Sequence, residues 1–321
     1  MSELLLPDRP EEPLPSDCCN SGCTPCILDV YDDLVKEWED KCNRLKLGAA
    51  GFDVNRSFNE PALFQTKYSP FRIAFIKPLS NDTSIFRFQA VKKDSDSDEM
   101  SYRDLETNLD LKPSQYLILQ GKDTVEGKEN HFTRAYTPIS TSKGCFDVVI
   151  KMYPKGKMSQ FIQKLVLGNI TFWRGPYGGF SYEPNKFRRL LMLCAGTGIA
   201  PLYSLASNIV NNEEDETTIK ILFCCKDEAN IILREEIHSL RSFWNFSADI
   251  YLPHSCASTC KPLYGETLKT GRLGQDAIAS ELKCNSTNTW VLICGNPEFC
   301  KEMHQFVSKC SIKAEHIHIF D

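Results

Sequence analysis

Three side chains with distinct chemistry stand together on one predicted strand, at Arg134, Tyr136 and Thr137. A guanidinium can bind two phosphate oxygens at once, and a tyrosine ring offers a flat face to an aromatic ligand. Arg134 and Tyr136 are two residues apart, so a strand places them on the same face. The hydroxyl and backbone N–H of Thr137 lie where the strand ends at Pro138, a natural place to meet a ring edge. The set suits a ligand that joins phosphates to a flat ring system.

A second group of binding residues follows at Gly156–Ser159, with the sequence Gly-Lys-Met-Ser. It opens an apolar segment with helical spacing, and the free N–H groups at a helix start attract phosphate, helped by a dipole worth about 0.3–1 kcal/mol. Gly156 lets the backbone approach closely, and Ser159 supplies a hydroxyl. Taken singly, Arg134 could be a surface ion-pair donor, Tyr136 a core residue and Ser159 a helix N-cap. In this order, the two groups favour a flavin dinucleotide site.

A third motif, Gly196-Thr197-Gly198-Ile-Ala-Pro201, follows an apolar strand and precedes a helix. This is the setting in which a glycine turn receives a nicotinamide dinucleotide. The glycines permit a tight turn and close backbone approach, and Pro201 suits a first helical turn. Cys294-Gly295 ends another strand, at the edge where such sheets bind ligands. A buried small residue is the alternative reading of Cys294, and we assign it no nucleophilic role.

The strands and helices that must position these motifs are predicted from two different patterns in the sequence. Residues 62–180 alternate with period two and predict an antiparallel β-barrel, whereas residues 187–321 alternate strands with helices and predict an α/β doubly wound parallel sheet. The polar runs Lys92–Asp98 and Gly121–Asn130 are expected to be exposed loops. The expected barrel strands are Phe71–Ile76, Ser84–Ala90, Gln115–Gln120, Thr133–Thr137, Cys145–Tyr153 and Asn169–Trp173; those of the sheet are Leu190–Cys194, Ile219–Cys225, Ala248–Leu252, Trp290–Cys294 and His316–Phe320, with helices from Ile199 and at Ile231–Leu240 and Pro297–Cys310.

A small appendage at residues 1–50 combines a proline-rich leader, four crowded cysteines and an amphipathic helix over residues 28–46. Three of the cysteines have the spacing Cys-x4-Cys-x2-Cys, which matches the first positions of plant-type iron–sulfur sites. A zinc site is an equal alternative and would stabilise the appendage by roughly 10–16 kcal/mol. Free or redox-active thiols remain the other reading. The candidate metal ligands are Cys18, Cys19, Cys23 and Cys26.

Composition narrows the class of protein further. The chain has 321 residues, a formal charge of −5 and 15 cysteines. The negative charge and the lack of a long basic run argue against nucleic-acid binding. Apolar stretches are too short for a membrane span, and from the first residues we expect neither a signal peptide nor a myristoylation site. The cysteines therefore indicate a reducing compartment, and we expect a cytoplasmic protein, with peripheral association with an organelle left open.

At this point a family resemblance is visible. Residues 62–321 resemble the NADH-cytochrome b5 reductase family, within the wider ferredoxin-reductase superfamily. The cysteine segment at residues 17–23 resembles a small "oxidoreductase-like" module. The segments that carry the resemblance to the reductases are Arg134–Ser140, Val149–Tyr153, Gly156–Ser159, Arg174–Gly178, Gly196–Pro201 and Cys294-Gly295.

The resemblance implies bound FAD, and NADH as the hydride donor. It implies that Thr137 acts near flavin N5 and that Cys294 lies near the nicotinamide, which makes these two the expected catalytic residues. Reduced flavin would then pass single electrons to a haem protein such as cytochrome b5, with Lys151, Lys155 and Lys157 as candidates for its docking patch. The expected cofactor-binding residues are Arg134, Tyr136, Thr137, Ser140, Lys151, Tyr153, Gly156, Lys157, Met158, Ser159, Gly196, Thr197, Gly198, Pro201, Asn230, Cys294 and Gly295.

Two departures from the family pattern bear on function. NADH-selective relatives carry an acidic residue where this chain has Asn230, and Lys226 adds positive charge nearby. Because a carboxylate there would repel the 2′-phosphate of NADPH, we expect weakened discrimination against NADPH. Only Pro154 and Lys155 separate Tyr153 from Gly156, where membrane-anchored relatives carry a longer loop. A metal-binding interaction protein with a catalytically impaired reductase domain is therefore the alternative hypothesis.

Overall fold

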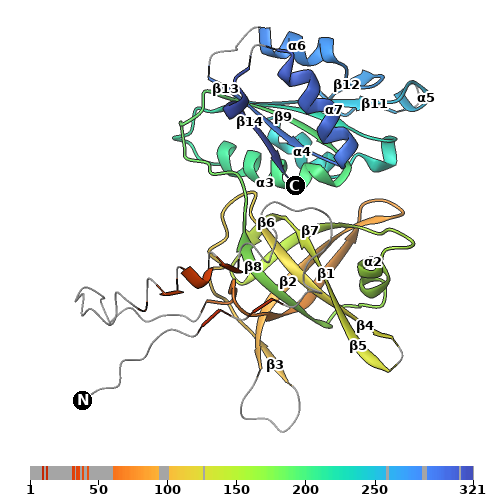
Figure 1. The fold of residues 1–321 in the computed structure, drawn as a ribbon. Coiled ribbons are helices and arrows are strands. Elements are labelled where there is room, and N and C mark those ends of the chain that lie inside the picture. The colour runs from red at the N-terminus through yellow and green to blue at the C-terminus, as the bar shows by residue number, and fades with distance from the viewer. Residues whose placement is uncertain are drawn as a thin grey trace.

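A change of architecture between Tyr177 and Arg189 divides the chain into a β-barrel and an α/β domain (Figure 1). The structure is a computed structural model. It describes residues 9–10, 12–13, 31–32, 34–36, 38–39, 42, 61–93, 101–125, 127–257, 260–283, 288–310 and 312–320. No helix among them is both long and apolar enough to cross a membrane.

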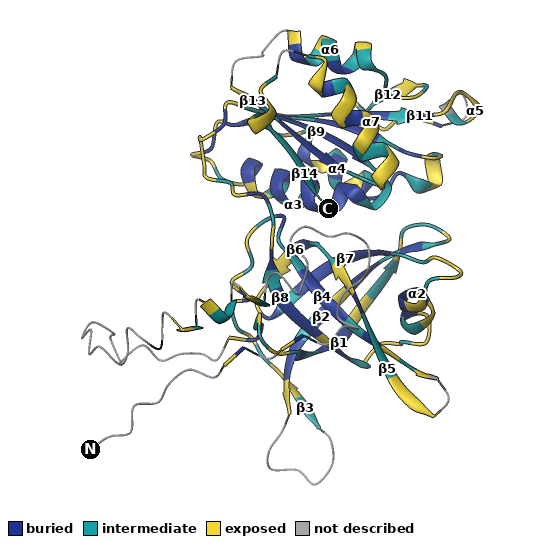
Figure 2. Ribbon diagram, in the orientation of Figure 1, coloured by how far each residue is buried: buried dark blue, intermediate teal, exposed yellow. Residues whose placement is uncertain are grey.

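The barrel is an antiparallel sheet in the order β5-β4-β8-β1-β2-β7-β6, with β3 paired to β2. Its core is aromatic: the Trp173 ring lies 4.7 Å from Phe88 and 5.0 Å from Phe146, between ring centroids. Figure 2 shows the buried residues along these strands. The strands are β1 (Ser69–Pro78), β2 (Thr83–Lys93), β3 (Tyr102–Asp104), β4 (Tyr116–Val125), β5 (Lys128–Tyr136), β6 (Pro138–Ser142), β7 (Cys145–Lys151) and β8 (Ile170–Tyr177), and helix α2 covers Lys157–Ile162.

All six predicted barrel strands are present, and the prediction of a loop over Gly121–Asn130 was wrong. Strands β4 and β5 continue as a paired hairpin out to Val125 and Lys128. Charged pairs stabilise it across the strands, since Lys122 Nζ lies 2.8 Å from Glu129 Oε1. The polar composition that suggested a loop belongs to a hairpin with solvated faces. Strands β3 and β6 were not predicted.

The second domain is a parallel sheet in the order β12-β11-β10-β9-β13-β14. Helices α3 and α4 pack on the face that also contacts the barrel, and α6 and α7 cover the other face (Figure 1). This confirms the doubly wound architecture, including all five predicted strands. The elements are β9 (Arg189–Ala195), α3 (Ile199–Val210), β10 (Thr218–Cys224), α4 (Arg234–Leu240), β11 (Phe246–Leu252), α5 (His254–Ala257), β12 (Thr267–Thr270), α6 (Gln275–Lys283), β13 (Thr289–Cys294), α7 (Pro297–Ser308) and β14 (Ile317–Phe320).

Differences from the expected elements of this domain have local causes. Helix α4 begins at Arg234 rather than at Ile231, because Leu233 adopts a left-handed conformation with φ 58°. The short strand β12 and the helices α5 and α6 were not predicted. The described residues between 31 and 42 are helical, within the expected helix over residues 28–46.

Apolar contacts and ion pairs join the two domains. Ile85, Ile139 and Val149 of the barrel belong to the same buried cluster as the residues of α3. Lys77 at the end of β1 adds ion pairs with α4, at 3.8 Å to Glu235 and 3.4 Å to Glu236. These contacts fix the α3 face of the parallel sheet against the barrel.

Candidate functional site

The end of β5 carries an exposed cation beside an anchored aromatic ring. Arg134 and Tyr136 stand opposite Leu119 and Leu117 of β4, so they share one face of the sheet, as predicted. The Tyr136 ring lies 6.0 Å from Trp173 and packs against the barrel core. Burial raises the pKa of the Tyr136 hydroxyl well above its usual range, so this group stays protonated. The Arg134 side chain is exposed.

Thr137 and Ser140 have different surroundings. Thr137 is half-buried between β5 and β6. The Ser140 hydroxyl donates to Asp147 Oδ2 at 3.1 Å, and Asp147 also accepts two hydrogen bonds from Arg87, at 2.7 and 2.8 Å. The one proton of the Ser140 hydroxyl is therefore used within the barrel.

Helix α2 brings the second motif to the same strand. Phe161 of α2 meets Phe132 of β5 edge to face, with 6.2 Å between ring centroids. Ser159 is buried, and its Oγ accepts a hydrogen bond from the backbone N–H of Tyr153 at 2.9 Å, which closes the two-residue loop before Gly156.

The other residues of this segment divide into exposed and engaged groups. The Tyr153 ring is 57% exposed, and Lys157 is also exposed. Met158 is buried in the barrel cluster, and Lys151 Nζ lies 3.3 Å from Asp82. The exposed side chains at this edge thus include the cations Arg134 and Lys157 and the Tyr153 ring. Together they fit a pyrophosphate joined to aromatic rings.

The glycine turn and the end of β13 touch each other. Gly196 has φ +55°, and a Cβ there would meet nothing within 4 Å, so its outer side is open. At Gly198 a Cβ would strike the Cys294 carbonyl oxygen and would lie 2.6 Å from its carbonyl carbon and 2.8 Å from Gly295 N. Only glycine allows this approach. Thr197 completes the turn, and Pro201 is buried in the first turn of α3.

Cys294 lies on the face of the sheet that is turned toward the barrel. It stands opposite Cys194 of β9 and Phe320 of β14, and it packs on the cluster that contains Ile139 and Val149. Burial raises the pKa of the Cys194 thiol well above its usual range, so this neighbour of Cys294 stays a neutral thiol. The predicted nicotinamide-side residue therefore stands at the junction of the two domains.

The turn after β10 contains an acidic residue that sequence reasoning did not single out. Asp227 Oδ1 accepts hydrogen bonds from the backbone N–H of Asn230 at 3.0 Å and from its Nδ2 at 2.7 Å. The Asn230 amide is thus turned onto Asp227. The signal was present in the sequence Asp-Glu-Ala-Asn, because Asp at the first position of such a turn commonly accepts from a backbone N–H a few residues on.

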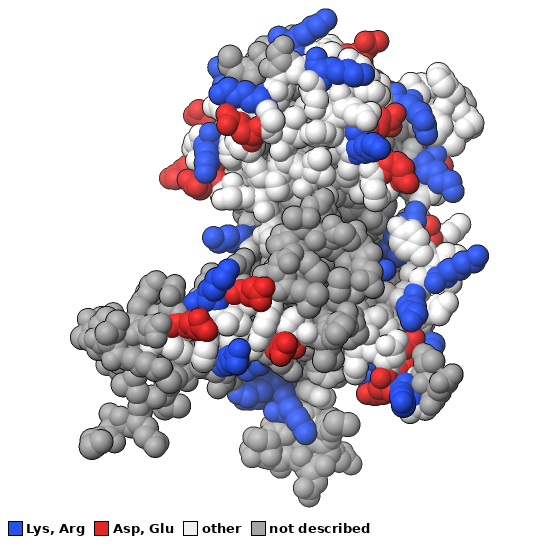
Figure 3. All heavy atoms as spheres, in the orientation of Figure 1, with Lys and Arg blue, Asp and Glu red and all other residues white. Residues whose placement is uncertain are grey.

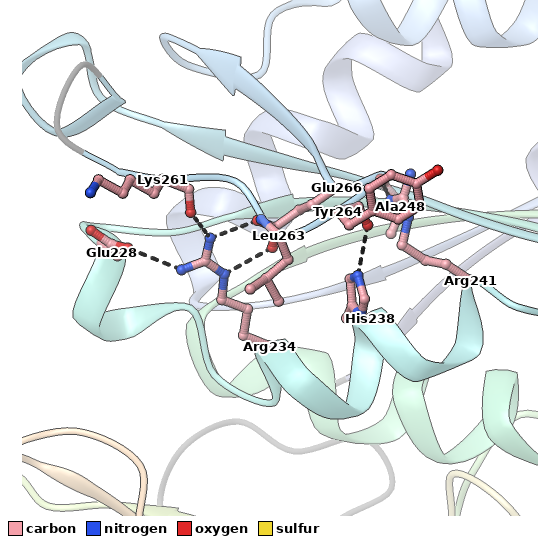
Figure 4. Close-up of polar contacts among 9 residues, drawn as sticks. All are labelled: Glu228, Arg234, His238, Arg241, Ala248, Lys261, Leu263, Tyr264 and Glu266. Carbon is pink, nitrogen blue, oxygen red and sulfur yellow. Dashed lines mark hydrogen bonds and ion pairs between the residues drawn. The ribbon is translucent and has the colours of Figure 1, made fainter.

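A guanidinium network holds α4 beside this turn (Figure 4). Arg234 donates to Glu266 from Nε at 2.9 Å and from Nη2 at 2.6 Å, and also to Glu228 Oε1 at 3.0 Å and to the Lys261 carbonyl at 2.7 Å. The Glu266 side chain is 3% exposed. Burial, the largest single influence, would raise the pKa of Glu266, but the hydrogen bonds from Arg234 and the Leu263 N–H, together with the charge of Arg234, hold the pKa below its usual range.

The described residues contain no group of three or more metal-ligating side chains. Cys18, Cys19, Cys23 and Cys26, the predicted metal ligands, lie outside the described residues.

The fold and these two motif-bearing edges define a two-domain oxidoreductase with one domain for a flavin and one for a pyridine nucleotide. Residues 70–182 match the oxidoreductase FAD-binding domain, residues 192–305 the oxidoreductase NAD-binding domain and residues 3–46 the N-terminal region of oxidoreductase-like proteins. The chain belongs to the NADH-cytochrome b5 reductase family.

Its similarity to individual members extends over most of the chain. It is 35% identical to the NADH-cytochrome b5 reductase-like protein of Mus musculus, over 98% of this chain and 94% of that protein. It is 36% identical to the Homo sapiens protein of the same description, over 94% and 91%. The cytochrome b5 reductase domain of Ulva prolifera nitrate reductase has a similar structure, with a TM-score of 0.66 at 26% identity, covering 82% of this chain and all of that domain.

We expect Gly198→Ala to disrupt the contact with Cys294. The added methyl group overlaps backbone atoms, so we expect a loss of about 1–3 kcal/mol in unfolding free energy and weaker binding of pyridine nucleotide. Thermal unfolding and nucleotide titration measure both effects. Gly274→Ala is the matched control, because a Cβ at Gly274 meets nothing within 4 Å. Equal behaviour of the two variants would contradict the contact.

We expect Glu266→Gln to destabilise the α/β domain by on the order of 3 kcal/mol at neutral pH, because it leaves Arg234 short of a buried partner. The pKa of Glu266 is lower in the folded protein than its unfolded value of about 4.3, so its charged carboxylate stabilises the fold at higher pH. This stabilisation is lost as the pH falls through the folded-state pKa. Denaturant unfolding at several pH values should show a smaller acid loss in the variant than in the wild type. Glu183→Gln, at an exposed pair with Lys186, should change little.

Proposed function

We propose that this protein is an FAD-dependent NADH reductase that passes electrons singly to a haem protein such as cytochrome b5. The observation that carries the proposal is the packing of α3 on β6. Helix α3 begins at the glycine turn that touches Cys294, and β6 begins directly after Thr137. The pyridine-nucleotide edge of the sheet therefore adjoins the flavin-side strand of the barrel.

Bound FAD would supply the conversion between a two-electron hydride and single electrons. The residues of the chain bind and orient the reactants. We assign Arg134 to the pyrophosphate, Tyr136 to the ring or its ribityl chain, and Thr137 to a hydrogen bond near N5. Gly156, Met158 and Ser159 shape the start of α2, where Lys157 adds charge. The other sequence-predicted contacts, at Ser140, Lys151 and Tyr153, belong to the same assignment.

On the nucleotide side, we assign Gly196, Thr197 and Gly198 to the dinucleotide backbone, because their turn leaves an open side at Gly196. Cys294 and Gly295 would border the nicotinamide at the face toward the barrel. Pro201 lies in the first turn of α3, which begins directly after that glycine turn.

Docking of an acidic acceptor requires a local basic surface on a chain of net charge −5. Lys155 and Lys157 are exposed beside the start of α2, whereas Lys151 is paired with Asp82. Figure 3 shows basic side chains on the side of the barrel that carries α2. We therefore assign the docking role mainly to Lys155 and Lys157.

The spectrum of the purified protein tests the proposal. We expect flavin absorbance that bleaches when NADH is added without oxygen, and weaker FAD binding by about 10- to 100-fold in Arg134→Ala, because a charged hydrogen-bond donor is lost. Arg103→Ala, an exposed arginine on β3, is the matched control and should retain FAD. A folded wild-type protein that takes up no flavin when FAD is in excess would overturn the proposal.

We expect the double variant Lys155→Glu and Lys157→Glu to lower kcat/KM for cytochrome b5 about tenfold at low ionic strength, through lost electrostatic attraction. Because Lys157 also lies at the proposed FAD site, rates are compared per bound FAD, and stopped-flow reduction of that bound flavin by NADH should change much less than the acceptor reaction. Lys261→Glu with Lys269→Glu places the same charge change on exposed positions of the other domain. If both double variants slow the acceptor reaction equally, the effect is one of net charge and not of docking at α2.

A further inference from the structure

We propose that Asp227, held in position by Asn230, selects NADH over NADPH by binding the adenosine ribose. This inference rests on the function proposed above and assigns the coenzyme preference to a residue of its own. It differs from the expectation from sequence, which placed the preference at Asn230 and predicted weakened discrimination.

Asp227 lies at the edge where a parallel sheet receives its ligand. It follows the carboxyl end of β10, and α5 follows the carboxyl end of the neighbouring strand β11. Between these two segments is a cavity of about 430 Å³, lined by Asp227, Glu228, Ala229, Ser255 and Cys256. The cavity thus carries two carboxylates at the place where an adenosine ribose would bind.

The Asp227 carboxylate has a fixed orientation. Both hydrogen bonds that it accepts from Asn230 end on Oδ1, which leaves Oδ2 for a ligand. Asn230 Oδ1 is buried, and no described residue donates a hydrogen bond to it, so the amide owes its orientation to Asp227. Asn230 is therefore a positioning residue, and the negative charge stands three positions before it.

One cation beside the cavity is already engaged within the protein. The guanidinium of Arg234 gives its hydrogen bonds to Glu266, Glu228 and the Lys261 carbonyl (Figure 4). Its pairing with Glu228 also neutralises the second carboxylate of the cavity. Arg272 is exposed after β12, at the same edge of the sheet. Lys226 is exposed, and its ammonium is a solvated point charge rather than a preorganised donor.

This arrangement distinguishes the two coenzymes by chemistry. A ribose 2′-hydroxyl can donate a hydrogen bond to Asp227 Oδ2, whereas a 2′-phosphate has negative charge and only acceptor oxygens toward that carboxylate. Because the Arg234 guanidinium is paired with Glu266 and Glu228, it does not offset this repulsion, and the phosphorylated coenzyme is disfavoured.

Calorimetric titration of the flavin-loaded protein with ADP-ribose and with its 2′-phosphate tests the inference without turnover. We expect wild-type protein to bind ADP-ribose about 100-fold more tightly. Asp227→Asn removes the charge at constant shape and should cut this ratio about tenfold or more. Asn230→Ala should cut it less, because the carboxylate stays but loses its anchor. The ratio of kcat/KM for NADH and NADPH should change in parallel.

Asp276→Asn, on α6, is the control for removal of a carboxylate elsewhere and should leave the ratio unchanged. FAD absorbance and melting temperature establish that each variant is folded and loaded. An unchanged ratio in Asp227→Asn would overturn the inference, as would a 2′-phosphate affinity that depends on Lys226 in a Lys226→Ala variant. Both results leave flavin reduction by NADH intact, so they differ from a failure of the proposed function, in which FAD is not bound.

Discussion

The structure depends on one close backbone contact, the approach of Gly198 to the carbonyl group of Cys294. It lets the start of α3 lie against the end of β13, so two motifs almost a hundred residues apart share one edge. The same helix packs on β6, and the parallel sheet is therefore anchored to the barrel at its binding edge. Any larger side chain at this position would separate the glycine turn from the end of β13.

Two charged side chains near the turn after β10 are engaged within the protein. Arg234 satisfies two carboxylates and a backbone carbonyl, and it is thereby removed from ligand binding. Asp227 is held on one oxygen only. The barrel edge has the opposite character, with Arg134 and Lys157 exposed and Tyr136 kept protonated by burial. The proposed flavin edge thus carries positive charge, and the turn after β10 carries a carboxylate.

Sequence patterns predicted the fold class and most of its strands, because burial imposes period two on the barrel and apolar runs on the parallel sheet. They failed where polar residues pair across strands, as in the β4–β5 hairpin, and where one backbone conformation decides, as at Leu233. For the site, the motifs identified segments and not the partners of individual side chains. Ser140 donates its hydrogen bond to Asp147, and Ser159 accepts one from the Tyr153 backbone. These partners, like the hydrogen bond from the Asn230 amide to Asp227, depend on the three-dimensional structure and could not be predicted from sequence.

The apolar cluster shared by Ile85, Ile139, Val149 and α3 limits how far the two halves of the protein are independent. If the chain were cut between Tyr177 and Arg189, each half would present to water the side chains that now cover one another. A barrel transplanted onto a foreign dinucleotide domain would therefore need a matching apolar surface on its new partner. A recombined protein in which the barrel takes electrons from a different domain would thus first have to rebuild this apolar interface.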